Sequence, residues 1–132
     1  MSTLTEEDAA IAFARAWNRL EPDDFLALLA PDARYASQWV AGELVGAPVI
    51  EDYLRGKMRT VRANGVNDPE ARVRVELGRT TKSFPDRPCA LMTQGESDPF
   101  QAAVLFDVRD GKVARYDLCI PGLLGPVGVF PA

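Results

Sequence analysis

The spacing of the hydrophobic residues changes after Asn64-Gly65, and that change constrains the fold more than any other feature. Before it, apart from one alternating stretch over 33–40, the hydrophobic residues recur every three or four positions; beyond it Val73, Val75 and Leu77 alternate with charged residues. The first pattern is typical of helices that bury one face, and the second is typical of half-buried strands. Helices followed by a series of strands predict a single α+β domain over the 132 residues.

Local signals divide the chain into elements. Thr5 precedes three acidic residues and a helical stripe, which is typical of a capped helix start. Asn64-Gly65 is a helix stop, and Asp110-Gly111 is a hairpin signal. The expected helices span 6–20, 22–30 and 48–64, and the expected strands span 33–40, 73–77, 89–96, 100–108 and 112–120.

Composition excludes several classes of function. The chain has no histidine, which excludes Ser-His-Asp and Cys-His catalysis and histidine-ligated zinc. Its 15 Lys and Arg against 19 Asp and Glu give a net charge of −4, which argues against a nucleic-acid binder and against binding to anionic membranes. No metal-ligand spacing appears, so we expect neither a metal nor another cofactor.

The chain also lacks the signals of secretion. Cys89 and Cys119 do not make a disulfide framework, and the acidic N-terminus is not a signal peptide. The longest uncharged stretch, 118–132, is too short to span a bilayer and contains three prolines. A cytoplasmic location is therefore expected.

The register of the last hairpin can be predicted from its apolar residues. A two-residue loop would pair Phe106 with Arg115, whereas a three-residue loop pairs Phe106 with Ala114. Register follows the face that must be buried, so we predict the second pairing. It gathers one wholly apolar face, formed by Ala102, Val104, Phe106, Ala114, Tyr116, Leu118 and Ile120.

The order of elements, with LLAPDARY before the first strand and FDVRDGKVARYDL at the last hairpin, resembles the nuclear transport factor 2-like superfamily, specifically its polyketide-cyclase (SnoaL-like) branch. The resemblance covers nearly the whole chain. It implies a cone, in which a curved, mixed sheet wraps three helices and leaves a pocket at its open end. Ketosteroid isomerases, epoxide hydrolases, polyketide cyclases, dehydratases and non-enzymes share this fold, so the fold does not select a function.

Matching residues against the isomerases of this superfamily argues against steroid-isomerase chemistry. The slot of their general-base Asp falls on Ser37, that of their oxyanion Tyr on Phe13, and that of their second pocket Asp on Val104. None of these three residues can perform the role of the residue it replaces.

The epoxide hydrolases of the superfamily match in part. Tyr35 and Ser37 fall on their Tyr and Asn slots, and Gln94 and Glu96 fall near their Arg and first Asp slots. Their second Asp falls on Leu118, so the Asp-Arg-Asp relay is incomplete.

These residues form the candidate site. Tyr35, Ser37, Gln94 and Glu96 are its expected polar groups, with Glu96 as general base or acid if the apolar cone raises its pKa. Alternatively, Glu96 faces solvent at the end of its strand, and the aromatic residues belong to the core. The expected substrate-binding residues are Phe13, Trp17, Trp39, Val104, Phe106, Tyr116 and Leu118.

The sequence therefore predicts a small-molecule pocket. The first hypothesis is cofactor-free acid–base catalysis on an apolar substrate: isomerisation, cyclisation, dehydration or epoxide opening. The alternative is a non-catalytic module of the same fold that binds a ligand or another protein.

Two surface features complete the predictions. Ala103, Leu105, Val113 and Cys119 make the convex sheet face more apolar than solvent exposure requires, which predicts a homodimer through the sheet. The tail over 121–132 carries no charge and is rich in proline and glycine. We expect it to be ordered, either as a lid over the cone or across the dimer; a disordered end is the alternative.

Overall fold

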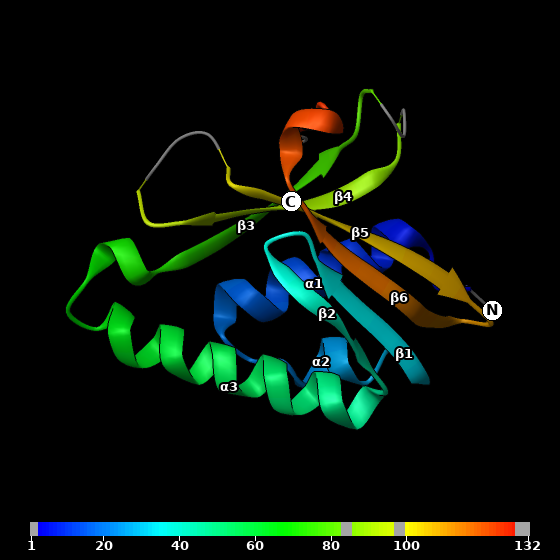
Figure 1. The fold of residues 1–132 in the computed structure, drawn as a ribbon, viewed down its shortest axis with the longest axis horizontal. Coiled ribbons are helices and arrows are strands. Elements are labelled where there is room, and N and C mark those ends of the chain that lie inside the picture. The colour runs from blue at the N-terminus through cyan, green and yellow to red at the C-terminus, as the bar shows by residue number, and fades with distance from the viewer. Residues whose placement is uncertain (1–2, 83–85, 97–99, 129–132) are drawn as a thin grey trace.

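A seven-stranded mixed sheet forms one layer of the structure, and three helices cover its concave face (Figure 1). The computed structural model describes residues 3–82, 86–96 and 100–128. The helices are α1 (Glu6–Arg19), α2 (Asp23–Leu26) and α3 (Ala47–Gly65), with 3-10 turns η1 (Pro69–Ala71) and η2 (Pro121–Leu123). The strands are β1 (Leu29–Ser37), β2 (Val40–Val45), β3 (Val73–Arg79), β4 (Pro88–Gln94), β5 (Ala102–Arg109), β6 (Lys112–Cys119) and β7 (Val127–Gly128).

The sheet confirms the predicted α+β class and the mixed strand arrangement. Its strand order is β2-β1-β6-β5-β4-β3-β7. The β1 and β6 strands are parallel, and the other neighbours are antiparallel. Because the first strand inserts beside the last long one, the two halves of the chain share one sheet.

The predicted start of the first helix is confirmed. The Thr5 hydroxyl accepts a hydrogen bond from the Asp8 N–H, and the Asp8 carboxylate accepts one from the Thr5 N–H, both at 3.0 Å. This capping box satisfies two N–H groups that the helix itself cannot satisfy. No helix within the described ranges is long and apolar enough to span a membrane.

The second helix is shorter than the sequence predicts. It ends at Leu26, and β1 begins at Leu29, inside the expected helical segment. The Leu28 carbonyl accepts a hydrogen bond from the Val113 N–H at 2.8 Å, so the chain here already bonds to β6. Pairing with the sheet therefore overrides the helical spacing of the hydrophobic residues.

The sequence does not predict β2. All but one of its six residues are exposed, and the remaining one is only partly buried. An edge strand with little burial lacks the alternation from which strands are recognised. Gly42 lies inside it with a φ of 95°, which further weakens its strand signal.

The predicted hairpin register is wrong by two residues. Phe106 lies opposite Tyr116, not Ala114. Asp110 and Gly111 form a two-residue turn with φ values of 52° and 74°, as a type I′ turn requires. A β-bulge then follows in β6: Val113 lies opposite Val108 and Arg115 lies opposite Asp107, so Ala114 is the extra residue without a partner on β5. The bulge also turns Val113 into the main core, whereas the prediction placed it on the convex face.

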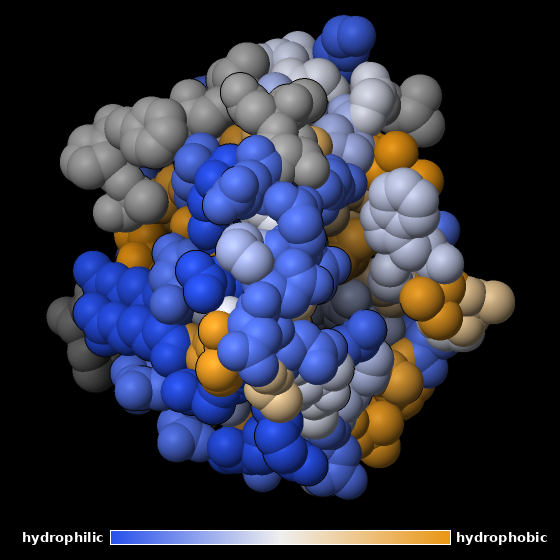
Figure 2. Space-filling view, turned by 90° about the vertical axis from the view of Figure 1, so that its left-hand side faces the viewer, coloured by the Kyte–Doolittle hydropathy of each residue, from blue (hydrophilic) through white to orange (hydrophobic). Residues whose placement is uncertain are grey.

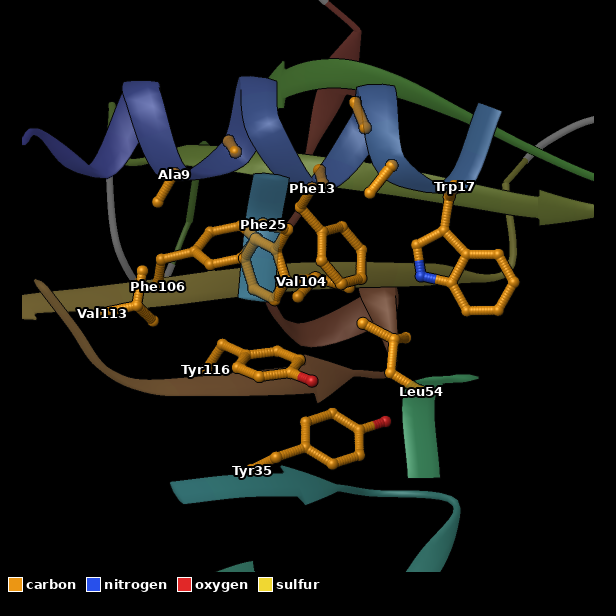
Figure 3. Close-up of a cluster of buried hydrophobic side chains, with 14 of the residues drawn as sticks. Ala9, Phe13, Trp17, Phe25, Tyr35, Leu54, Val104, Phe106, Val113 and Tyr116 are labelled. Carbon is orange, nitrogen blue, oxygen red and sulfur yellow. The ribbon is translucent and has the colours of Figure 1, made fainter. Parts of the chain in front are cut away.

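Buried hydrophobic residues form two clusters on opposite faces of the sheet. The larger lies between the sheet and the helices and centres on packed aromatic rings from α1, α2, β5 and β6 (Figure 3). The Phe13 ring packs edge-on against Phe25 and Phe106, with ring centroids 5.1 and 5.4 Å apart. The smaller cluster consists of Cys89, Leu91, Ala103, Leu105, Cys119 and Leu124.

The C-terminal segment lies against the smaller cluster. The Leu124 carbonyl accepts hydrogen bonds from the Thr81 and Lys82 N–H groups, at 3.1 and 2.9 Å, and β7 pairs with β3. Figure 1 shows η2 on the side of the sheet away from the helices. The described part of the tail, 121–128, is therefore no lid over the cone, and residues 129–132 lie outside the described residues.

This packing bears on the predicted dimer. Ala103, Leu105 and Cys119, which suggested an interface, are buried together with Leu124 of the same chain. The homodimer stays a prediction, because the apolar character of these three residues is explained by packing within one chain.

Candidate functional site

A cavity of about 540 Å³ opens between α1, α3 and the concave face of the sheet. Figure 2 faces the end of the molecule that carries η1 and the C-terminal end of α3, and the hollow near its centre has mainly hydrophilic residues to its left and hydrophobic ones to its right. The cavity is lined by Phe13, Trp17, Tyr35, Ser37, Trp39, Val40, Tyr53, Leu54, Lys57, Val61, Val73, Met92, Thr93, Gln94, Gln101, Ala102, Tyr116 and Leu118.

Regular spacing within the elements aims these side chains inward. Phe13 and Trp17 are four residues apart on α1, so they lie on one face of the helix, one turn apart. Tyr35 and Ser37 are two apart on β1 and share its concave face. Lys57 lies one turn after Tyr53 on α3, with its Nζ 5.7 Å from the Tyr53 ring centroid.

Three tyrosines form one wall of the cavity. The Tyr35 ring centroid lies 4.5 Å from that of Tyr116 and 5.5 Å from that of Tyr53. Burial raises the pKa of Tyr35 and that of Tyr116 well above the usual range, and the neighbouring Tyr53 raises both further. Both hydroxyls are therefore protonated at neutral pH, and that of Tyr35 is already hydrogen-bonded with the side chains of Tyr53 and Ser37.

The indole N–H of Trp17 also lies in the cavity wall but is buried against neighbouring side chains and is not open to the cavity. The Trp17 side chain is buried, with 7% of the residue exposed, and its Nε1 has no hydrogen-bond partner within the described chain. A buried donor left without a partner typically costs about 1–3 kcal/mol. In Figure 3 the indole nitrogen lies on the ring edge that faces Phe13 and Leu54, and the Tyr35 and Tyr116 hydroxyls point toward the same region.

Eight of the predicted site residues line the cavity: Phe13, Trp17, Tyr35, Ser37, Trp39, Gln94, Tyr116 and Leu118. Val104 and Phe106 do not; both are completely buried in the core behind it. They share the concave face with the lining residues, but the rings of Phe13 and Phe25 cover this part of the sheet. The prediction found the right face and extended it too far along β5.

Glu96 does not line the cavity. It is exposed in the turn that follows β4, two residues beyond Gln94. Gly95, which precedes it, has a φ of 85°, so the chain leaves the strand conformation before Glu96 is reached. The expected alternation along the strand therefore stops short, and the solvent-facing alternative for Glu96 is the one observed.

Two predicted polar groups are engaged in local structure. The Gln94 side-chain nitrogen donates to the Ala71 carbonyl at 3.2 Å, which ties β4 to η1. The Ser37 hydroxyl accepts a hydrogen bond from the Trp39 N–H at 3.2 Å within the β1–β2 turn. Trp39 itself is 62% exposed and lies at the rim of the cavity.

The sequence analysis missed the contribution of α3. Tyr53, Leu54, Lys57 and Val61 line the cavity, whereas its hydrophobic stripe suggested only core packing. The sequence signal for this part of the cavity was the presence of Tyr53 and Lys57, because a helix face that is wholly buried in the core rarely carries a hydroxyl or an ammonium group.

The chemistry of the lining follows from its residue types. Among the described residues that line the cavity there is no Asp, Glu, His or Cys, and Lys57 is the charged group. Nor do the described residues include a group of three or more metal-ligating side chains placed to hold an ion. The site is an apolar, aromatic cavity with hydrogen-bond donors and without a carboxylate base.

The chain was compared with known proteins. The family model of the SnoaL-like domain matches residues 10–116. No curated protein matches the chain.

Solved structures share the fold at low sequence identity. A SnoaL-like protein of unknown function from Burkholderia thailandensis is 17% identical, with a TM-score of 0.60 over 92% of this chain and 100% of that one. A putative polyketide cyclase from Pseudomonas putida is 19% identical, with a TM-score of 0.56 over 88% of this chain and 91% of that one. A putative ketosteroid isomerase from Kribbella flavida is 21% identical, with a TM-score of 0.56 over 98% and 84%. At these identities the likeness shows a shared fold.

Proposed function

Because this chain belongs to the SnoaL-like domain family and encloses a cavity between its sheet and helices, we propose that it binds a small, largely apolar molecule there. The observation that carries the proposal is the cavity itself, about 540 Å³ in volume and lined mainly by aromatic and aliphatic side chains. Sites for small ligands typically measure roughly 300–1,000 Å³ and combine apolar walls with a few polar groups.

The shape of the wall favours a flat ligand. Tyr35, Tyr53 and Tyr116 present a series of tilted aromatic rings, and Trp17 lies on the facing helix. Aromatic side chains bury a large area against a planar molecule and favour offset or edge contacts with its rings. A two- or three-ring compound matches both this geometry and the volume.

Catalysis is the second candidate. The Tyr35 and Tyr116 hydroxyls are suited to donate a hydrogen bond to a carbonyl, but burial raises their pKa values and so makes them weaker acids for supplying a proton. With Glu96 outside the cavity, no described lining residue offers a carboxylate to remove a proton. Binding therefore has more support than acid–base catalysis of the isomerase, cyclase, dehydratase or epoxide-hydrolase type.

A matched pair of variants tests the proposal. Val61 lines the cavity on α3, whereas Val66 lies just beyond the helix and is 70% exposed. Titration of a panel of two- and three-ring compounds, followed by tryptophan fluorescence and calorimetry, should identify saturable ligands of the wild type. Val61→Phe should then weaken binding roughly tenfold, or about 1.4 kcal/mol, by occupying ligand space, and Val66→Phe should leave the Kd unchanged. Failure of the whole panel to bind, or equal effects of the two variants, would overturn the proposal.

A further inference from the structure

We propose that the ligand of this cavity is a planar ring compound with a single carboxylate, which binds with its rings against the tyrosines and its carboxylate at Lys57. The inference rests on the proposed function and names the chemical class of its ligand. Its first observation is the composition of the wall, because Lys57 is the one charged side chain among the described residues that line the cavity. A cation at the edge of an otherwise uncharged cavity selects for a ligand with one negative group.

Helical spacing places Lys57 in the stripe of α3 that faces the cavity. This stripe consists of Tyr53, Leu54, Lys57 and Val61, all of which line the cavity. Helical side chains lean toward the N-terminus, and the Lys57 Nζ lies 5.7 Å from the centroid of the Tyr53 ring, one turn earlier. An ammonium over an aromatic ring is attracted to it. The charge is therefore held against the cavity wall and does not extend away from it.

No carboxylate of the described chain neutralises this ammonium. Among the residues that the structure describes, no Asp or Glu forms an ion pair with Lys57. Arg55, two positions earlier on α3, is by contrast paired with Glu51 and Asp23, at 3.1 and 2.5 Å. The residues three and four positions from Lys57 are all uncharged, so its own helix offers no partner. The ammonium is available to a ligand.

The aromatic wall becomes more exposed toward Lys57. The rings of Tyr116, Tyr35 and Tyr53 follow one another, with centroids 4.5 and 5.5 Å apart. Tyr116 is 1% and Tyr35 7% exposed, Tyr53 is partly buried, and Lys57 is exposed. A ligand that follows this row has its rings in the buried part and its charged group where water still reaches it. This order matters, because a carboxylate taken fully into an apolar cavity would lose its hydration at a cost that one ion pair does not recover.

The described lining balances a single negative charge. Its two glutamines are engaged within the fold, since the Gln94 side chain donates to the Ala71 carbonyl and the Gln101 side chain bonds both backbone groups of Gln94. Lys57 therefore stands alone as a charged donor in the described lining. One ammonium balances a carboxylate, whose one charge is shared by two oxygens, whereas a phosphate dianion would keep an uncompensated charge.

A double-mutant cycle between ligand and protein tests this inference. The probes are 2-naphthoate and 2-naphthamide, which share their rings and shape but differ in charge at neutral pH, because a carboxyl group titrates near pH 4. At low salt, the affinity of naphthoate relative to naphthamide should fall about three- to fivefold from the wild type to Lys57→Gln. Lys57→Arg, which keeps the charge, should preserve the ratio.

Arg59→Gln is the matched control. Arg59 is exposed on the same helix and lies outside the described lining, so its substitution removes an equal charge from a surface that the ligand does not contact. Arg59→Gln should therefore change the ratio by less than about 1.5-fold, within the range of exposed charges that make no direct contact.

Two further measurements locate the bound carboxylate. About 0.5 M sodium chloride should bring the wild-type ratio close to that of Lys57→Gln, because salt screens an ion pair at an exposed position. Val61→Phe should weaken the binding of naphthoate as it weakens that of neutral ligands, because the rings of both occupy the same cavity.

The outcomes separate this inference from the proposed function. If the ratio is the same in the wild type and Lys57→Gln, or if Arg59→Gln lowers it equally, the inference is overturned, while binding of the neutral panel upholds the proposed function. Naphthoate binding that is unaffected by Val61→Phe also overturns the inference, because the anion then binds outside the cavity. If neither probe nor the wider panel binds, the proposed function fails and the inference fails with it.

Discussion

The side chain of Asn18 pairs with both backbone groups of Val75, as a neighbouring strand would. Its Nδ2 donates to the Val75 carbonyl at 2.8 Å, and its Oδ1 accepts from the Val75 N–H at 2.7 Å. The contact fixes the end of α1 to β3, across 57 residues of sequence. Trp17 is the preceding residue, so this pair of hydrogen bonds also sets the position of the indole in the cavity.

Loss of this pair should destabilise the fold. Asn18→Ala removes both hydrogen bonds and leaves the Val75 N–H and carbonyl without their partner, which should cost about 2 kcal/mol. Urea denaturation followed by circular dichroism measures the change. Asn64→Ala, at an exposed position of α3, is the matched control and should cost less than about 0.5 kcal/mol. Equal losses in the two variants would contradict the role assigned to Asn18.

Buried tyrosines should make the fold sensitive to alkali. Burial raises the pKa of Tyr116 in the folded state above the ordinary value of about 10 that it has when unfolded. The stabilisation of the folded state by the protonated Tyr116 is fully present below pH 10. It is lost as the pH rises above 10, because at those pH values the unfolded chain releases a proton that the folded chain keeps. Melting temperatures between pH 8 and pH 11 should fall less steeply for Tyr116→Phe than for the wild type. Parallel curves would show that Tyr116 is not protected from ionisation.

Glu96 should be dispensable for the cavity, although the sequence suggested it as the catalytic group. The residue is exposed in the turn after β4 and is absent from the lining. Glu96→Gln should therefore leave the Kd of a cavity ligand within about twofold of wild type, well under the 1.4 kcal/mol of a tenfold change. A tenfold loss of affinity, or of any turnover found with that ligand, would show that Glu96 contributes to the site.

The sequence predicted the cavity best where periodicity is uninterrupted. Two-residue alternation placed Tyr35 and Ser37 on the concave face, and helical spacing placed Phe13 and Trp17 together. These positions follow from local backbone geometry, which extends over a whole element.

Interruptions of the backbone account for what could not be predicted. The bulge at Ala114 shifts the hairpin pairing by one residue from the two-residue-loop alternative and by two residues from the three-residue loop that was predicted. Gly95, with its positive φ, ends the alternation that would have brought Glu96 inward. The β2 strand carries no burial pattern, because its pairing with β1 depends on main-chain hydrogen bonds. Each of these is decided by tertiary pairing that a single sequence does not display.

The last prediction concerns Leu124, which covers the smaller hydrophobic cluster. Leu124 is 5% exposed and packs with Cys89 and Cys119, and burial raises the pKa of Cys89 to about 11. Because the thiolate is the reactive form, a thiol reagent should label Cys89 only when the segment over 121–128 opens. Leu124→Ala should cost about 2 kcal/mol and should accelerate labelling in the folded protein.

Leu54→Ala is the control for that prediction, since it truncates a leucine of similar burial in the larger cluster, on the opposite face of the sheet. It should lower the free energy of unfolding by a similar amount, about 2–3 kcal/mol. If the C-terminal segment opens locally, labelling of Leu124→Ala will be faster than its loss of global stability accounts for, and labelling of Leu54→Ala will not. Labelling rates that follow global stability alone in both variants would show that the segment opens only when the whole domain unfolds.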